Sequence, residues 1–134
     1  MNFLNRFADP VYCFMRLIVG LMFACHGGQK LLGFPGGGHG GAEGLMLIGG
    51  AVELIDGLLI AFGFLTRLAA FVSAGEMAVA YFMAHAPQGF HPINNGGELA
   101  ILFCFIFLYI AAAGPGPWSV DAAWGSRGGY RKAY

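Results

Sequence analysis

Ionisable side chains lie inside long apolar stretches of this sequence, and their placement indicates what the chain does. The first stretch, 11–32, reads VYCFMRLIVGLMFACHGGQKLL and contains Arg16, His26 and Lys30. Its length suits a membrane span, since a spanning helix takes roughly 20 mostly apolar residues at about 1.5 Å of rise each. Because charges are costly in lipid, such groups normally face a bundle interior or a wet cavity and pair with one another. We therefore expect other apolar stretches to supply their partners.

The composition is that of an integral membrane protein. Of the 134 residues, 57% are hydrophobic and only 10% are charged, whereas a typical soluble domain has about 25% charged residues. The formal net charge is zero, so nothing indicates nucleic acid as a partner. The length predicts a single domain over 1–134.

Four apolar stretches predict the fold class, which is an all-α, membrane-spanning four-helix bundle. The expected spans are 10–32, 45–65, 68–86 and 97–113. Short connections favour an up-down-up-down order, and the segment GPGPWSVD should end the fourth helix. The basic residues outside the spans fall on one side, which predicts that both termini are cytoplasmic. These residues are Arg6, Arg67, Arg127, Arg131 and Lys132. Trp118 and Asp121 are expected at that cytoplasmic interface.

Carboxylates in the second and third spans supply partners for Arg16. Counted from the cytoplasmic ends, Arg16, Asp56 and Glu76 lie within about one helical turn of the same depth. Glu53 lies about a turn further out, on the same face as Asp56. The sequence therefore predicts a buried ion-pair network of these four residues, although pairing of helices explains the pattern as well as a function does.

A second polar group is predicted at the outer mouth of the bundle. His26 and Lys30 share one helix face because they are four residues apart. Glu98 begins the fourth span, so we expect a Lys30–Glu98 pair, with the carboxylates at 53, 76 and 98 pointing inward. The residues that complete this ligand pocket are His85, Asn94 and Asn95, and the loops could add His39, Glu43 and His91. The histidine spacing matches no tight zinc pattern, so no metal site is predicted.

Four motifs, taken in order, resemble the DoxX family of small four-span bacterial membrane proteins. They are RLIVGLMFACHGGQKLLGF, GGAVELIDGLLIAFGFLTRLAA, NNGGELA and GPGPWSVD. The positions that correspond to recurrent family residues are Arg16, Gly20, His26, Gly27, Lys30, Glu53, Gly57, Gly63, Glu98, Gly114, Pro115, Gly116 and Asp121. The resemblance implies a multi-pass protein of a bacterial inner membrane. It also implies a subunit of a thiosulfate:quinone oxidoreductase or of a membrane oxidoreductase that handles thiol or oxidative stress.

Two functional hypotheses follow, in different classes. In the first, the chain is a quinone-binding subunit whose apolar helices hold the quinone tail, while His26, Lys30 and Glu98 bind the ring carbonyls and exchange protons. The chain contains no flavin, haem or iron–sulfur motif, so electrons would come from a partner protein. In the second, the chain is a non-catalytic scaffold that anchors a partner or assembles with itself among membrane lipids. A carrier for a small anion is a third reading and would need oligomerisation.

Overall fold

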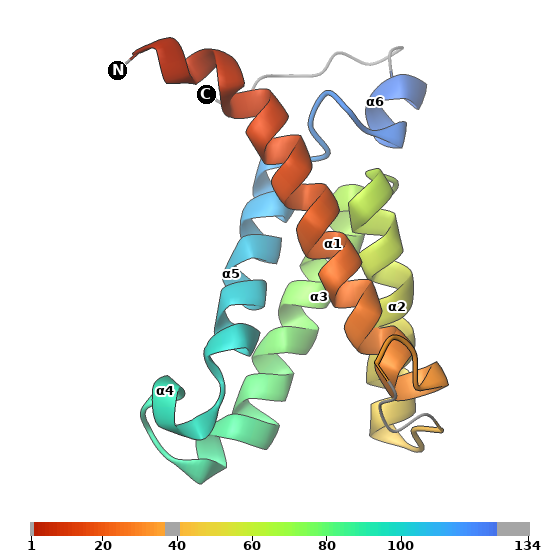
Figure 1. The fold of residues 1–134 in the computed structure, drawn as a ribbon, viewed down its shortest axis with the longest axis vertical. Helices are drawn as coiled ribbons and strands as arrows, with labels where there is room; N and C mark the ends of the chain where they lie inside the picture. Colours follow the sequence, from red (N-terminus) through yellow and green to blue (C-terminus); the bar gives the residue numbers. More distant parts are fainter. Residues whose placement is uncertain (1, 37–40, 126–134) are drawn as a thin grey trace.

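The computed structural model describes residues 2–36 and 41–125, and the elements in these ranges are helices. The four longest are α1 (Ala8–Leu32), α2 (Leu45–Phe62), α3 (Thr66–Ala80) and α5 (Glu98–Ala113). They run alternately down and up along the long axis of the molecule (Figure 1). Their bounds lie within a few residues of the predicted spans, except that regular α-helix ends earlier in the third span.

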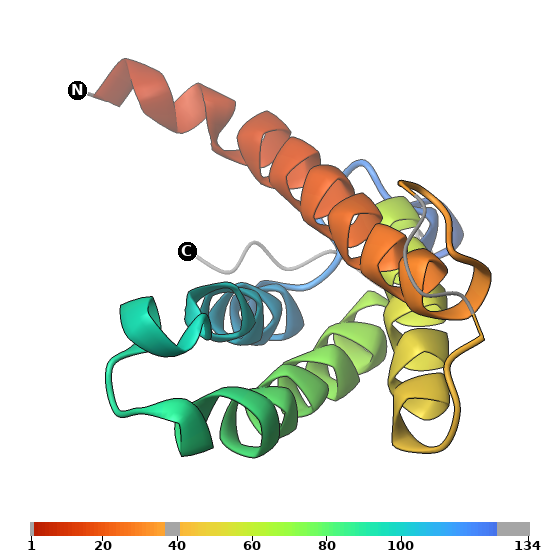
Figure 2. The same cartoon turned by 60° about the horizontal axis from the view of Figure 1, so that its bottom comes forward.

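Short helical elements occupy the two ends of the bundle. At one end, the 3₁₀-helix η1 (Asn2–Phe7) precedes α1, and α6 (Val120–Trp124) follows α5. At the opposite end, α3 continues into the π-helical turn η2 (Tyr81–His85) and the 3₁₀-turn η3 (Ala86–Gln88), which α4 (Pro92–Asn95) follows. Viewed from other directions, α1 is strongly inclined to its neighbours, and its N-terminal part extends beyond them (Figure 2).

Length and composition make three helical segments candidates to cross a membrane. These are Phe3–Leu32, Leu45–Phe62 and Thr66–Gln88, while the apolar helix Glu98–Ala113 is shorter, with 16 residues. Large apolar side chains on their outer surfaces, such as Ile55 and Phe71, are more than half exposed. A water-soluble monomer rarely exposes so much contiguous apolar surface, whereas such side chains suit lipid.

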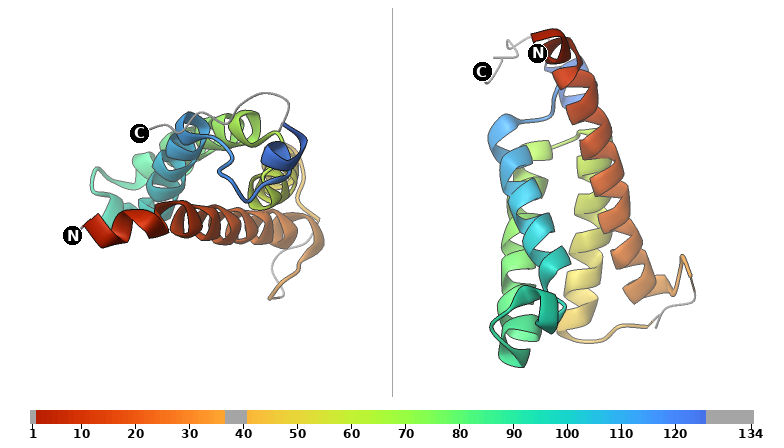
Figure 3. Two further views of the ribbon diagram at one scale, coloured as in Figure 1. Left: turned by 90° about the horizontal axis from the view of Figure 1, so that it is seen from above. Right: turned by 60° about the vertical axis from the view of Figure 1, so that its left-hand side comes forward.

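Glycines hold α1 and α2 in direct backbone contact. The helices form two main pairs, α1 with α2 and α3 with α5, and the two pairs lie side by side (Figure 3). A Cβ atom at Gly20 would lie 2.5 Å from the backbone nitrogen of Ala61, and one at Gly57 would lie 2.5 Å from that of Ala24. Gly27 fits as tightly against Leu54. Because lipid removes most of the hydrophobic drive for helix association, such close backbone packing is a main source of cohesion.

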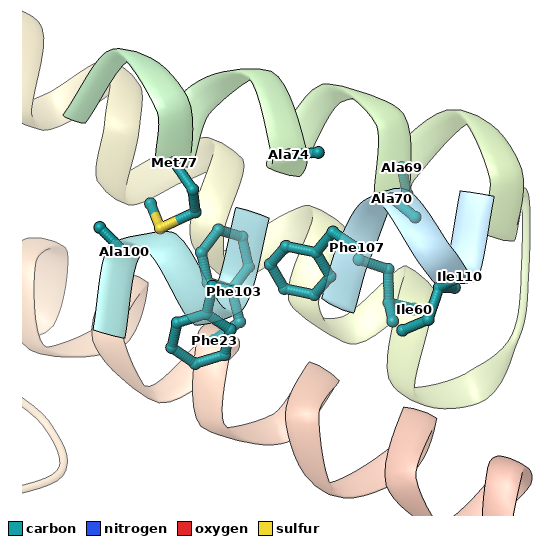
Figure 4. Packing of buried hydrophobic residues seen from close by; sticks show 10 residues of the cluster. All are labelled: Phe23, Ile60, Ala69, Ala70, Ala74, Met77, Ala100, Phe103, Phe107 and Ile110. Atoms are coloured by element: carbon teal, nitrogen blue, oxygen red, sulfur yellow. The ribbon is translucent and has the colours of Figure 1, made fainter. Parts of the chain in front are cut away.

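Aromatic side chains fill the wider space between α1 and the α3–α5 pair. Phe23 of α1 stands against Phe103 and Phe107 of α5, with ring centroids 5.5 and 4.7 Å apart (Figure 4). Phe23 and Phe107 are at most 1% exposed. Large rings thus connect α1 to α5 and keep their backbones apart.

Side-chain caps link α3 to α6 and to α5 at the end of the molecule where α6 lies. The Asp121 carboxylate accepts hydrogen bonds from the backbone N–H groups of Leu65 and Thr66 at 2.9 and 3.0 Å, which caps the N-terminus of α3. Arg67 donates to the carbonyl oxygens of Ala111 and Ala112 at the C-terminus of α5, where a cation is favourable. The fourth long helix therefore ends at Ala113, directly before the run GPGPWSVD, as predicted. Asp121 holds α6 against α3, and Arg67 holds α3 against α5.

Filling a glycine contact should separate α1 from α2. Gly57→Ala is expected to lower the free energy of unfolding by about 1–3 kcal/mol, because its Cβ has no room beside Ala24. Gly75→Ala is the matched control, since a Cβ there meets nothing within 4 Å, and its helix propensity improves. Thermal unfolding of both variants in detergent measures the difference. Equal melting temperatures for the two variants would contradict the packing described above.

Candidate functional site

A cavity lies where α1, α2, α3, η2 and α5 meet, near the end of the bundle that carries α4. Its volume is about 220 Å³, and it is partly open to the surroundings. Aromatic and aliphatic side chains form most of its wall, among them Phe23, Met77 and Phe103. Four ionisable residues from three elements also line it: His26 and Lys30 of α1, Glu53 of α2 and His85 of η2. Apolar walls with a few convergent polar groups are the usual make-up of a small-molecule site.

An ion pair between α1 and α2 is the central polar contact of this cavity. Lys30 Nζ donates to Glu53 Oε1 at 2.7 Å, the one salt bridge found within residues 2–36 and 41–125. The Glu53 side chain is 4% exposed, whereas that of Lys30 is 33% exposed. The expected Lys30–Glu98 pair is therefore wrong. The antiparallel glycine contact between α1 and α2 sets Lys30 beside Gly50, one turn from Glu53, and the long lysine side chain reaches that carboxylate.

Further carboxyl groups stand behind the pair, between α2 and α3. Glu76 interacts electrostatically with Glu53, Lys30 and Asp56. Glu53 Oε2, Glu76 Oε2 and Asp56 Oδ2 are all buried without a hydrogen-bond partner. Asp56 lies near Ser73, whose hydroxyl oxygen is also buried without a hydrogen-bond partner. Asp56 also lines an apolar groove of about 480 Å³ on the outer face of α2 and α3. Glu76 therefore lies within electrostatic reach of Glu53, Asp56 and Lys30, and Lys30 forms its ion pair with Glu53.

Arg16 does not belong to this group, which corrects the predicted network. It is 2% exposed and donates to the carbonyl oxygens of Ile60 at 2.9 Å and Trp118 at 2.6 Å. Its guanidinium also fills the space beside Gly63, where an added Cβ would lie 2.1 Å from Nη1. The depth estimate failed because α1 is inclined and extends beyond the end of α2 (Figure 2), so that Arg16 lies level with the last turn of α2. Arg16 therefore joins α1 to α2 and to the segment after α5.

The π-helical turn η2 places and orients His85. A single π turn inside an α-helix is frequently found at a functional site. His85 Nδ1 lies 3.0 Å from the carbonyl oxygen of Asn95. Since a carbonyl oxygen only accepts, Nδ1 carries the proton, which leaves Nε2 for a ligand. Asn95 is itself 4% exposed and donates to the Gly89 carbonyl at 2.8 Å.

The remaining predicted pocket residues divide between the cavity and its surroundings. The His26 ring lines the cavity and meets Phe103 edge-on, with centroids 6.0 Å apart. Asn95 supports His85 from behind, while Asn94 is exposed. Glu98 is also exposed, in the first turn of α5, where an acidic residue is favourable. The inward orientation predicted for Glu98 is thus wrong.

Loop and tail expectations remain largely untested. Glu43 and His91 are exposed and do not line the cavity. His39 and residues 126–134, which include three of the predicted cytoplasmic basic residues, lie outside the described residues. Within the described ranges, no group of three or more His, Cys, Asp or Glu residues is placed to hold a metal ion.

Two features of the site escaped the sequence reasoning. The pairing of Lys30 with Glu53 could have been predicted from the spacing of the glycines in the two helices. Four of them, Gly20, Gly27, Gly50 and Gly57, fix the antiparallel register of α1 on α2. The role of Asp121 as a cap for α3 had no signal in the sequence, since 55 residues separate it from Thr66.

Apolar spanning helices with an embedded ion pair define the class: the chain is a multi-pass, all-helical membrane protein. The family model described as DoxX matches residues 11–86, which is more than half of the chain and contains the Lys30–Glu53 pair. The chain belongs to the DoxX family.

Relatives agree with this assignment. An uncharacterized protein of Haemophilus influenzae is 40% identical over 128 residues, covering 90% of this chain and 96% of the relative. Inner membrane protein YqjF of Escherichia coli is 32% identical over 125 residues, covering 88% and 95%. The uncharacterized membrane protein Rv3486 of Mycobacterium tuberculosis is 30% identical over 138 residues, covering 88% and 83%. No solved structure gives a significant match to the chain.

Breaking the ion pair from one side should cost more than removing it whole. Lys30→Met is expected to lower the free energy of unfolding by about 1–3 kcal/mol, because it leaves the buried Glu53 carboxylate unpartnered. Lys30→Met combined with Glu53→Gln should lose less than the sum of the two single variants. The control Glu98→Gln should stay within about 0.5 kcal/mol of the parent. Unfolding in mixed micelles supplies the four values, and strict additivity would contradict a direct contact.

Proposed function

We propose that this chain is the quinone-binding membrane subunit of an oxidoreductase, with the cavity as the site for the quinone headgroup. The observation that carries the proposal is the position of the Lys30–Glu53 pair. Its cation and its unpartnered oxygen, Glu53 Oε2, both belong to residues that line a cavity with apolar walls. A polar ring with an apolar tail is the ligand that such a combination suits.

The volume of the cavity limits what enters it. Pockets for drug-sized ligands begin at roughly 300 Å³, and this one measures about 220 Å³. It has room for one substituted six-membered ring, so an isoprenoid tail would have to leave through the open side and lie along the exposed apolar helix surfaces. The rings of Phe23 and Phe103 form part of the apolar wall that a bound headgroup would contact.

Each polar residue of the cavity has a role that its surroundings allow. Lys30 can donate a hydrogen bond to a ring carbonyl while it stays paired with Glu53. His85 Nε2 is an acceptor in the neutral ring and can accept from the O–H group of the reduced ligand, whereas a protonated His85 or a His26 N–H group can donate to the second carbonyl. A bound quinone would supply two-electron, two-proton redox chemistry, and the electron donor would be a partner protein.

The proposed topology in the membrane accompanies this assignment. Four spans, α1, α2, α3 with η2, and α5, would cross the bacterial inner membrane with both termini in the cytoplasm. Arg6 belongs to η1 and Arg67 to the first turn of α3, and both elements begin at the proposed cytoplasmic end of the bundle, which suits the positive-inside rule. The cavity then opens near the outer face.

Quinone binding can be tested with purified protein. Titration of decylubiquinone into protein in nanodiscs should quench the intrinsic fluorescence in a saturable manner. Lys30→Met and Glu53→Gln should weaken binding at least about tenfold, the value of a hydrogen bond to a charged group. Glu98→Gln, which removes an exposed carboxylate outside the cavity, is the matched control and should bind as the parent does.

A non-catalytic scaffold predicts different results from the same titration. In that case decylubiquinone would partition into the lipid without saturation, and the variants would not differ in binding. Loss of binding in Glu98→Gln alone would favour the outer-mouth pocket expected from the sequence and would contradict the cavity as the site.

A further inference from the structure

More negative than positive charge lies behind the cavity. Glu53, Asp56 and Glu76 come together around a single cation, Lys30. If all four groups were ionised, their net charge would be −2. Arg16 cannot supply the balance, because its hydrogen bonds go to the carbonyl oxygens of Ile60 and Trp118.

An uncompensated double negative charge is not stable at this depth. Glu53 is 3% exposed, and each of the three carboxyl groups has one oxygen buried without a hydrogen-bond partner. Asp56 borders a groove whose other lining residues are apolar and which faces lipid in a spanning bundle. Since a carboxylate in hydrocarbon costs several kcal/mol unless it is paired, binding two further positive charges here would remove that cost.

Hydrogen ions are the positive charges that fit the geometry. A metal ion takes several oxygen or nitrogen ligands at once, and no set of three His, Cys, Asp or Glu residues within the described ranges is arranged in that way. A proton needs only one carboxyl oxygen. It also turns an unpartnered acceptor into a neutral group that is less costly in lipid.

We propose that Glu53, Asp56 and Glu76 form a proton store that holds two exchangeable protons beside Lys30 and delivers them to the cavity through Glu53. Glu53 belongs to both the cavity wall and the carboxyl group cluster, whereas Glu76 interacts with Glu53 without lining the cavity. Protons therefore leave by way of Glu53, and Glu76 replaces them. Chains of carboxyl groups within a membrane serve as proton relays in this manner.

Several helical elements contribute ionisable residues to the store and its surroundings. α1 contributes His26 and Lys30, α2 contributes Glu53 and Asp56, α3 contributes Glu76, and η2 contributes Tyr81 and His85. α5 carries Cys104 and Tyr109 along its length and the exposed Glu98 in its first turn. Of these, His26 and His85 line the cavity itself and are the groups that would pass protons between Glu53 and a ligand.

The size of the store matches the chemistry of the proposed function, on which its use by a ligand rests. Reduction of a quinone to a quinol forms two O–H bonds and consumes two electrons and two protons. The electrons would come from a two-electron donor on a partner protein, such as a reduced flavin, which is oxidised in the step. The two protons would come from Glu76 and Asp56 and would pass to the ligand through Glu53, which returns to its ionised form beside Lys30 after each transfer.

Infrared spectroscopy tests the store without any ligand. At pH 8, exposed carboxyl groups are ionised, so a carboxylic C=O stretching band from the protein in dodecyl maltoside, a detergent without ester carbonyls, reports buried protonated groups only. We expect a band equivalent to about two protonated carboxyl groups per chain, which shifts in D₂O. Glu76→Gln and Asp56→Asn should each reduce the band, and Glu98→Gln should leave it unchanged.

The wild-type spectrum alone can overturn the proposal, so the test does not depend on the folding of a variant. Absence of the band at pH 8, or its appearance only after a chelator and sodium-free buffer remove bound metal ions, would show that metal cations balance the charge. A band in a protein that does not bind decylubiquinone would leave the store standing and contradict the quinone site. Saturable binding without the band would contradict the store alone.

Discussion

The backbone contact between α1 and α2 is the constraint on which the rest of this structure depends. Gly20 and Gly27 on one helix and Gly57 on the other leave no room for a Cβ, so the two helices have one register and one distance. In lipid, where apolar side chains gain little by leaving their surroundings, this van der Waals contact replaces the hydrophobic core of a soluble protein. It also decides which polar side chains meet, because a slip of one turn would separate Lys30 from Glu53.

The same contact explains why a cavity exists on the opposite side of α1. Close packing against α2 leaves the α5 side of α1 wide, and the rings of Phe23, Phe103 and Phe107 fill most of that space (Figure 4). Beyond these rings, towards η2, no side chain fills the space between the helices. The cavity that results is lined by the Lys30–Glu53 pair and His85. Rigid packing thus surrounds a polar space that is held open at one end of the bundle.

Much of the fold follows from hydropathy, but which charged residues pair with one another was visible only in the three-dimensional structure. Apolar length predicted the long helices, and the break after Ala113 was visible in the run GPGPWSVD. The depth predicted for Arg16 was wrong because it was counted from an assumed membrane plane, whereas α1 is inclined and extends beyond its neighbours (Figure 2). Lys30 was paired with Glu98 because Lys30 precedes one outer loop and Glu98 follows the other. The register set by the glycines of α1 and α2 favoured Glu53 instead. The π turn at Tyr81–His85 leaves no pattern in sequence that could have located it.

The most direct test is the distance between the Lys30 side-chain nitrogen and the Glu53 carboxyl carbon in a lipid bilayer. The chain has two lysines, Lys30 and Lys132, and four glutamates, so a solid-state NMR dipolar experiment with ¹⁵Nζ-lysine and ¹³Cδ-glutamate gives a simple spectrum. The structure predicts a strong coupling that disappears in Glu53→Gln and persists in Glu98→Gln, since Nζ and Oε1 are 2.7 Å apart. A coupling that survives Glu53→Gln, or disappears in Glu98→Gln, would contradict the account.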